Sequence, residues 1–155
     1  MAALFQNWSQ SGAAFHYVSS SPWQLYPHLT RHLTDHGFPQ GSFHLRAFRL
    51  RDHLLRRVLM LRRSGKAAVI RAMFKTFPQR QFLLVGDSGE ADPEIYGTMA
   101  RRFPEQIAGV LIRRIPGPRD NKVRYARAFR GASSAAVRLF HEPEELAGIE
   151  LPTIV

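Results

Sequence analysis

The order of the apolar runs along the chain is the feature that most constrains its fold. Five short runs are typical of buried strands, and they lie at residues 14–18, 43–45, 81–85, 107–112 and 135–140. Stretches with apolar residues at helical spacing separate these runs. Strands and helices that alternate at this pitch form a parallel sheet with helices on both faces. The sequence therefore predicts the α/β fold class.

Capping and breaking residues place the helices between these strands. Ser21 is expected to cap a helix that the following proline begins, and Gly37 is expected to end it. Ser64 and Gly65 are expected to separate an arginine-rich helix from another helix that begins near Lys66.

Length and composition indicate one domain. The chain has 155 residues and is 45% hydrophobic, which allows a substantial core. We assign residues 1–140 to this core and residues 141–155 to a C-terminal tail or short helix. The absence of cysteine excludes disulfides and thiolate metal sites, and it fits a cytoplasmic protein. No apolar run approaches the roughly 18 residues that a membrane-spanning helix needs.

Positive charge is concentrated in one part of the chain. The formal net charge is +10, and seven arginines but a single acid occur between Arg46 and Arg63. This segment is either a solvated helix face or a peripheral contact with an anionic membrane, to which each basic residue adds ~1 kcal/mol. Nucleic acid is not an expected partner, because no recognisable reading motif is present and no aromatic residue lies between Arg51 and Arg63.

The stretch Gly86-Asp87-Ser88-Gly89 allows two interpretations. The chain has neither a Gly-x-Ser-x-Gly elbow nor the strand pattern of two antiparallel barrels, so a nucleophilic Ser88 is not favoured. Asp87 follows a buried strand, where a carboxylate is costly without a cation, and Mg2+ prefers such oxygen ligands. Asp92 is expected to cap the next helix and to reach back toward the same ion. The alternative is a solvated acidic turn in which Asp92 is an ordinary N-cap.

Further candidate residues lie at the end of the first strand and on two helices. Ser19 and Ser20 precede a predicted helix N-terminus, where hydroxyl and N–H groups bind phosphate, although capping alone would also explain serines there. Lys66 opens a predicted helix, where the macrodipole disfavours a cation, so it either neutralises a bound phosphate or points into water. Three histidines at helical spacing suit either a transition metal or a solvated border; they are His28, His32 and His36.

Together these pieces resemble a known family. The segments FHYVSSSPWQLYPHL, GFPQGSFHLRAFRLRD, the Lys66 helix, FPQRQFLLVGDSGEADPEIY and IAGVLIRRI occur in the family's order. They look like the catalytic domain of phosphatidate phosphatases of the yeast actin-patch-protein type, over about residues 1–115. This family belongs to the haloacid-dehalogenase-like superfamily and is distantly similar to lipins. The resemblance implies a Rossmann-like parallel sheet.

The resemblance also implies a role for each candidate residue. Ser19 takes the place of the family's phosphate-binding hydroxyl, with Ser20 beside it. Lys66 takes the place of the lysine that neutralises the phosphate and the attacking carboxylate. Asp87 is similar to the acidic Mg2+ ligand, and Asp92 to its supporting partner. The implied reaction is the Mg2+-dependent release of phosphate from phosphatidate, which leaves diacylglycerol.

The sequence departs from the family at the nucleophile. The family carries D-x-D-x-T after its first strand, which is central in the sheet, and none of the five aspartates here is separated from another by one residue. We therefore expect an inactive chain whose core lacks the first strand, from a fragment or a misplaced start codon. The alternative is a pseudoenzyme that serves as a phosphate-binding or anionic-lipid-binding module.

Overall fold

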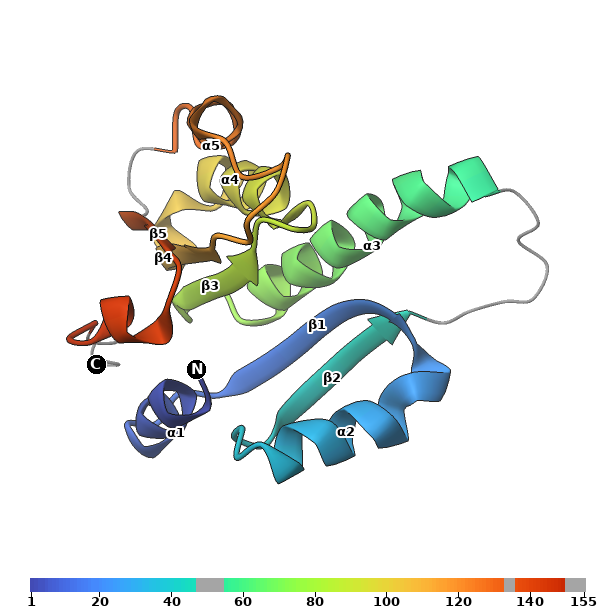
Figure 1. The fold of residues 1–155 in the computed structure, drawn as a ribbon, viewed down its shortest axis with the longest axis vertical. Helices are drawn as coiled ribbons and strands as arrows, with labels where there is room; N and C mark the ends of the chain where they lie inside the picture. Colours follow the sequence, from blue (N-terminus) through green and yellow to red (C-terminus); the bar gives the residue numbers. More distant parts are fainter. Residues whose placement is uncertain (47–54, 133–135, 150–155) are drawn as a thin grey trace. The chain divides into compact units, whose positions relative to one another are not determined.

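The protein is a parallel α/β structure in two parts. The computed structural model describes residues 1–46, 55–132 and 136–149 (Figure 1). Within these ranges, residues 55–64 and 136 are described by their backbone alone. The chain divides into two compact units, Met1–Ile70 and Arg71–Val155. Helices and strands alternate in both, and every strand pair is parallel. The predicted fold class is therefore confirmed, and the arrangement is consistent with a Rossmann-like fold.

The first unit contains a pair of parallel strands. Its elements in chain order are α1 (Ala2–Gln10), β1 (Phe15–Pro22), the 3-10 turn η1 (Trp23–Leu25), α2 (Tyr26–Asp35) and β2 (Gly41–Arg46). Trp8 of α1 is buried, and Phe5 stacks on it and contacts the rings of Phe15 and Phe38. This aromatic cluster packs α1 against the start of β1.

Two glycines shape the connection between α2 and β2. Gly37 has a φ of +69° and ends α2, as the sequence predicts, and the next amide donates back to the carbonyl of Leu33. Gly41 begins β2 so close to β1 that a Cβ atom there would lie 2.5 Å from the carbonyl oxygen of Phe15. A residue with a side chain at position 41 would therefore push the two strands apart.

The end of β1 is irregular. Val18 pairs with His44 and Pro22 pairs with Arg46, so β1 advances by four residues while β2 advances by two. The extra residues form a bulge over positions 19–21. The prediction that Ser21 caps a helix is wrong, because β1 continues through position 22 and α2 begins only after η1.

The second unit is a three-stranded parallel sheet with helices packed on it. The strands β3 (Phe82–Asp87), β4 (Ile107–Arg113) and β5 (Ala136–Phe140) lie in the order β3-β4-β5. The connecting elements are α4 (Asp92–Arg102), η2 (Pro104–Gln106) and α5 (Lys122–Ala128), and η3 (Pro143–Leu146) follows β5. The core of this unit is almost fully buried and includes Phe74, Met99, Val110, Ile112, Phe140 and Leu146.

Helix α3 (Leu55–Thr76) is longer than the sequence indicated. It runs without a break through Ser64 and Gly65, so the prediction of two helices with a new start near Lys66 is wrong. Glycine inside a helix costs about 1 kcal/mol relative to alanine, which a helix of 22 residues tolerates. At the end of α3, Phe74 is buried against the ring of Phe82, which packs this end on β3.

β1 and β3 are edge strands of separate sheets. Within the described residues, β1 pairs with β2 alone and β3 pairs with β4 alone. Each therefore has one row of backbone N–H and C=O groups that no described strand pairs with, and such edges readily accept a further strand. That a central strand belongs beside them stays a prediction.

Candidate functional site

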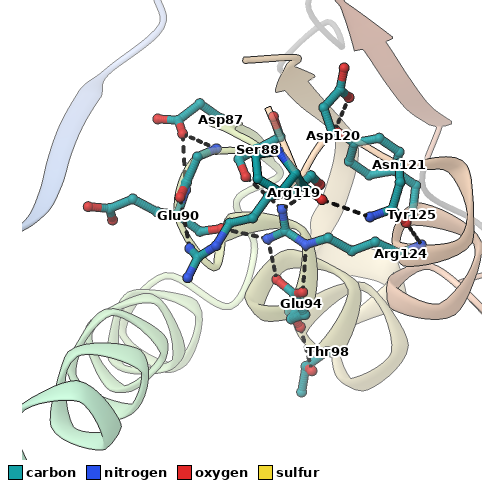
Figure 2. A network of polar contacts seen from close by, with 12 residues as sticks. Asp87, Ser88, Glu90, Glu94, Thr98, Arg119, Asp120, Asn121, Arg124 and Tyr125 are labelled. Carbon is teal, nitrogen blue, oxygen red and sulfur yellow. Dashed lines mark hydrogen bonds and ion pairs between the residues drawn. The ribbon is translucent and has the colours of Figure 1, made fainter. Parts of the chain in front are cut away.

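Asp87 is the last residue of β3, at the carboxyl end of its sheet. One carboxylate oxygen, Oδ1, accepts hydrogen bonds from the backbone N–H groups of Gly89 and Glu90 at 2.8 and 3.2 Å (Figure 2). These bonds fix the direction of the carboxylate. No described residue donates a hydrogen bond to the other oxygen, Oδ2, so the turn leaves that oxygen able to bind a cation.

Asp92 lies beside Asp87 at the start of α4. It is only 2% exposed, and its Oδ2 accepts a hydrogen bond from the backbone N–H of Asp87 at 3.2 Å. A Cβ atom at Gly86 would lie 2.3 Å from that same oxygen, so the position accommodates only glycine. The prediction that Asp92 is the N-cap is wrong: Ala91 is the N-cap, and no side chain caps the helix. The helix N-terminus still favours a buried carboxylate there.

The surroundings of these two carboxylates are acidic. The hydroxyl of Tyr96 donates to the carbonyl of Val85 at 3.0 Å. Burial raises the pKa of Tyr96 well above its usual value near 10, and the charges of Asp92, Asp87 and Glu90 raise it further. The phenol therefore stays a neutral donor, and the same negative potential favours a cation at this end of β3.

Ser88 is enclosed by the protein. It is fully buried, its hydroxyl accepts a hydrogen bond from the N–H of Ile115 at 2.8 Å, and its own N–H donates to the carbonyl of Arg113 at 2.9 Å. A nucleophile needs access to its substrate and a neighbouring base. Ser88 is therefore a structural residue that joins the loop after β3 to the end of β4, and Asp87 remains the candidate for chemistry.

Arg124 of α5 holds the loop after β3 in place (Figure 2). Its guanidinium forms a bidentate ion pair with Glu94 of α4, with N–O distances of 2.8 and 2.9 Å. It also donates to the carbonyl oxygens of Ser88 and Glu90, while Arg119 donates to the carbonyl between them at 2.8 Å. Three successive carbonyls of the loop are therefore bound by two arginines, which makes both arginines positioning residues for Asp87.

Sequence reasoning missed this network because it missed α5. The helix has only seven residues, and its local signal is Asn121, the N-cap, whose side chain accepts a hydrogen bond from the N–H of Arg124 at 2.8 Å. The Asp-Asn pair that opens the helix could have indicated its start. The partners of Arg124 in α4 and in the loop after β3 lie 30 or more residues away along the chain and leave no local pattern.

Ser19 lies in the bulge of β1. Its hydroxyl donates to the Oγ of Ser21 at 3.0 Å and accepts a hydrogen bond from the N–H of that residue at 3.1 Å. The expected helix N-terminus directly after Ser20 is absent from this part of the structure, because the strand continues. Lys66 lies inside α3 and not at its start, so the argument from an unfavourable helix end no longer applies to it.

The structure brings two of the five predicted site residues together. Asp87 and Asp92 are joined by a hydrogen bond within the second unit. Ser19, Ser20 and Lys66 all belong to the first unit. Their convergence with the two aspartates stays a prediction.

The donor set at the end of β3 fits magnesium. Among the residues that the structure describes, no group of three or more His, Cys, Asp or Glu side chains could hold a metal ion. This result includes His28 and His32 of α2 and His36, the C-cap of that helix; the ring centroids of His32 and His36 lie 4.1 Å apart. Asp87 and Asp92 offer oxygen ligands alone, and Mg2+ is commonly bound through one or two carboxylates and several waters.

The side chains of most of the predicted membrane-facing segment lie outside what the structure describes. Residues 47–54 are not described, and the side chains of residues 55–64 are not described either. A contact between the segment from Arg46 to Arg63 and lipid therefore stays a prediction. In the described ranges, no helix combines the length and the apolar character that crossing a bilayer requires.

The fold and the site define a parallel α/β protein with paired carboxylates at the carboxyl end of a strand, the place where such folds bind ligands. The family described as the catalytic domain of phosphatidate phosphatase APP1 matches residues 1–114. The chain belongs to this family, and the resemblance noted from the sequence is confirmed.

Two curated relatives extend the comparison. Phosphatidate phosphatase APP1 of Saccharomyces cerevisiae is 36% identical over 99 residues, which are 64% of this chain and 16% of that protein. An uncharacterized protein of Schizosaccharomyces pombe is 34% identical over 110 residues, which are 70% of this chain and 18% of that protein. The chain thus spans less than a fifth of the length of these relatives. No solved structure matches the chain significantly.

Proposed function

We propose that the chain is part of a Mg2+-dependent phosphatidate phosphatase of the haloacid-dehalogenase-like kind, which acts in the cytoplasm and at membrane surfaces. The reaction releases phosphate from phosphatidate and leaves diacylglycerol. One observation carries the proposal, namely the match of residues 1–114 to the catalytic domain of the APP1 family. A parallel α/β fold alone suits many phosphomonoesters, so the choice of substrate rests on the family.

In this proposal Asp87 and Asp92 hold Mg2+. Bound there, the ion would screen the negative charge on the phosphoryl oxygens of the substrate. Three features support this role: Oδ2 of Asp87 accepts no hydrogen bond from the described residues, Asp92 is hydrogen-bonded to the backbone of Asp87, and Arg124 fixes the loop between them.

Ser19, Ser20 and Lys66 bind the phosphate in the same proposal. The serines lie in the bulge of β1, where the regular pairing with β2 is interrupted. Lys66 contributes a positive charge from α3. Hydroxyl donors and an ammonium group directed at one phosphate stabilise the charge that develops on its oxygens in the transition state.

We infer that the 155-residue chain by itself does not hydrolyse phosphatidate. Covalent phosphoryl transfer needs an attacking carboxylate and a second acid/base group, and no two aspartates of this sequence are separated by one residue. A strand that carries D-x-D-x-T would supply both groups, and the open edges of β1 and β3 are the places where it would pair.

A binding module without catalysis is the second candidate. The absence of a paired-aspartate motif from the sequence favours it. Such a module would use the same phosphate-binding residues, together with the basic segment from Arg46 to Arg63, to bind phosphatidate or another anionic lipid.

Phosphate release from a short-chain, water-soluble phosphatidate tests the proposal. Three proteins are compared in Mg2+: the 155-residue chain, a joined protein in which a segment carrying the D-x-D-x-T motif that the family resemblance implies precedes the chain, and the joined protein with the first motif aspartate changed to asparagine. We expect release from the intact joined protein alone. Asp87→Asn should abolish that release, whereas Asp35→Asn should leave it unchanged, because the Asp35 side chain is 62% exposed on α2.

Two results would change the conclusion. Release by the 155-residue chain alone, lost in Asp87→Asn, would establish a phosphatase and overturn the inference that the chain is inactive. No release by a folded joined protein that still binds soluble phosphatidate would favour the binding module.

A further inference from the structure

An exposed apolar surface lies directly after the bulge of β1, in the segment that joins β1 to α2. Figure 1 shows the bend of the backbone there. It consists of Trp23, Leu25 and Tyr26, which are 53%, 41% and 37% exposed, and we call it the Trp23 surface. The rings of Trp23 and Tyr26 stack with centroids 4.8 Å apart, and Tyr26 meets the ring of Phe43 edge-on at 5.3 Å. Large apolar residues grouped in this way mark a contact site.

We propose that the Trp23 surface docks on a lipid bilayer with anionic headgroups. Tryptophan and tyrosine are enriched where membranes meet water, because their rings are apolar and each carries one polar group. Leu25 adds an aliphatic side chain that loses contact with water when it enters the acyl region. The three residues together have the composition of an interfacial contact.

The charge around this surface fits an anionic partner. Residues 1–34 contain neither aspartate nor glutamate and only one Lys or Arg, which is Arg31, while the whole chain carries a net charge of +10. Arg46 pairs in register with Pro22, the residue directly before Trp23. The net charge of the chain and Arg46 at this end of the first unit attract an anionic bilayer, and no acidic side chain within the first 34 residues opposes that attraction.

The position of the surface suits the delivery of a lipid headgroup. Trp23 follows Ser19 by four residues, so their Cα atoms are at most about 14 Å apart at ~3.3–3.6 Å per extended residue. The phosphate of a bilayer lipid lies at the depth where interfacial aromatic rings sit. Docking would thus bring headgroups near Ser19. This last step rests on the proposed function, whereas the docking itself does not.

Tryptophan fluorescence tests the docking, because the chain has two tryptophans and only one lies on the surface: Trp8 is 6% exposed. The protein is mixed with phosphatidylcholine vesicles that contain phosphatidate or, at equal charge, phosphatidylserine. We expect a blue shift of the emission and quenching by brominated acyl chains. Trp23→Phe should abolish both, and Trp8→Phe, if its circular dichroism is unchanged, should retain both.

Sedimentation with the same vesicles measures the affinity. The double variant Trp23→Ala, Leu25→Ala should bind at least about tenfold more weakly, given the usual free energy of burying such side chains. Phe77→Ala is the matched control, because Phe77 is 42% exposed and belongs to the second unit. Its affinity should equal that of the unchanged protein.

Several outcomes would overturn the docking: Trp23 emission that no vesicle changes, sedimentation that the double variant does not weaken, or a dimer that the double variant dissociates. The dimer would mean that a second copy covers the surface. Equal insertion into phosphatidylserine and phosphatidate vesicles would support docking even if phosphatase activity is absent. If the joined protein hydrolyses soluble phosphatidate but Trp23 does not insert into any vesicle, the proposed function stands and the docking proposal is overturned.

Discussion

At the scale of single residues, Arg124 fixes the loop that follows Asp87. Its side chain is 14% exposed, and it binds Glu94 and two loop carbonyls. Arg124→Ala would leave these partly buried acceptors without a donor, so we expect a loss of about 2–4 kcal/mol in the free energy of unfolding. Urea unfolding measures it. Arg127 is an exposed arginine of the same helix, and Arg127→Ala should lower the free energy of unfolding by less than ~0.5 kcal/mol. Equal losses in the two variants would mean that the lost positive charge, and not the contacts of Arg124, causes the effect.

Gly86 is the second residue whose identity the site dictates. An added Cβ would lie 2.3 Å from Oδ2 of Asp92, so Gly86→Ala should displace that carboxylate and cost at least ~2 kcal/mol. Gly65→Ala is the comparison, since a Cβ there meets nothing within 4 Å, and it should stabilise α3 by about 0.5–1 kcal/mol. Thermal unfolding separates the two. A neutral Gly86→Ala would show that the end of β3 adapts easily.

At the scale of elements, Tyr96 joins α4 to β3 and makes that contact sensitive to alkali. Its pKa is raised in the folded protein, so the stabilisation is complete below pH 10, where the unfolded phenol is still protonated, and declines as the pH rises above that value. Tyr96→Phe should cost about 1 kcal/mol at pH 8 for the lost hydrogen bond to Val85. Urea titrations measure the free energy of unfolding of the unchanged protein and of Tyr96→Phe, and the difference between these two values should become smaller above pH 10. A constant difference would contradict the buried phenol.

Local patterns predicted the elements whose signal is strong and erred where tertiary packing decides. The strands β3, β4 and β5 were placed within two residues, because the apolar runs of β3 and β4 are continuous and that of β5 is interrupted only by Arg138. The helix start at Ser21 failed because pairing with β2 extends β1 beyond its serines. The break at Gly65 failed because propensity is a weak term in a long helix.

The candidate site was predictable to the same degree. Asp87 and Asp92 flank a strand-to-helix turn, and parallel α/β geometry alone places both at one end of β3. The role of Arg124 was not predictable, because it depends on the packing of α5 beside α4, and Arg124 lies 30 residues after its partner Glu94 in the sequence. The local sequence therefore indicates the two aspartates of the strand-to-helix turn, whereas the arginine that fixes this turn comes from a distant segment.

At the scale of the whole molecule, the residues that match the family do not include all the residues that support the candidate site. The match covers residues 1–114, yet Arg119 and Arg124, which bind the carbonyls of the Asp87 loop, lie beyond it. The last strand and η3 also lie beyond the match and bury Phe140 and Leu146 in the core of the second unit. The segment after residue 114 is therefore part of the framework of the site and not an appendage to it.

The net charge of the whole chain makes a last prediction about membranes. At +10, attraction to anionic vesicles acts over the Debye length, which is about 10 Å at 0.1 M salt and about 3 Å at 1 M. We expect the affinity for phosphatidate vesicles to fall at least about tenfold between 0.05 and 0.5 M salt, as several basic contacts are screened. The blue shift of Trp23 at saturating lipid should not change, because apolar insertion is not screened. Sedimentation and fluorescence on the same samples measure both quantities, with neutral phosphatidylcholine vesicles as the control. An affinity independent of salt would mean that the basic charge of the chain does not contribute to the attraction.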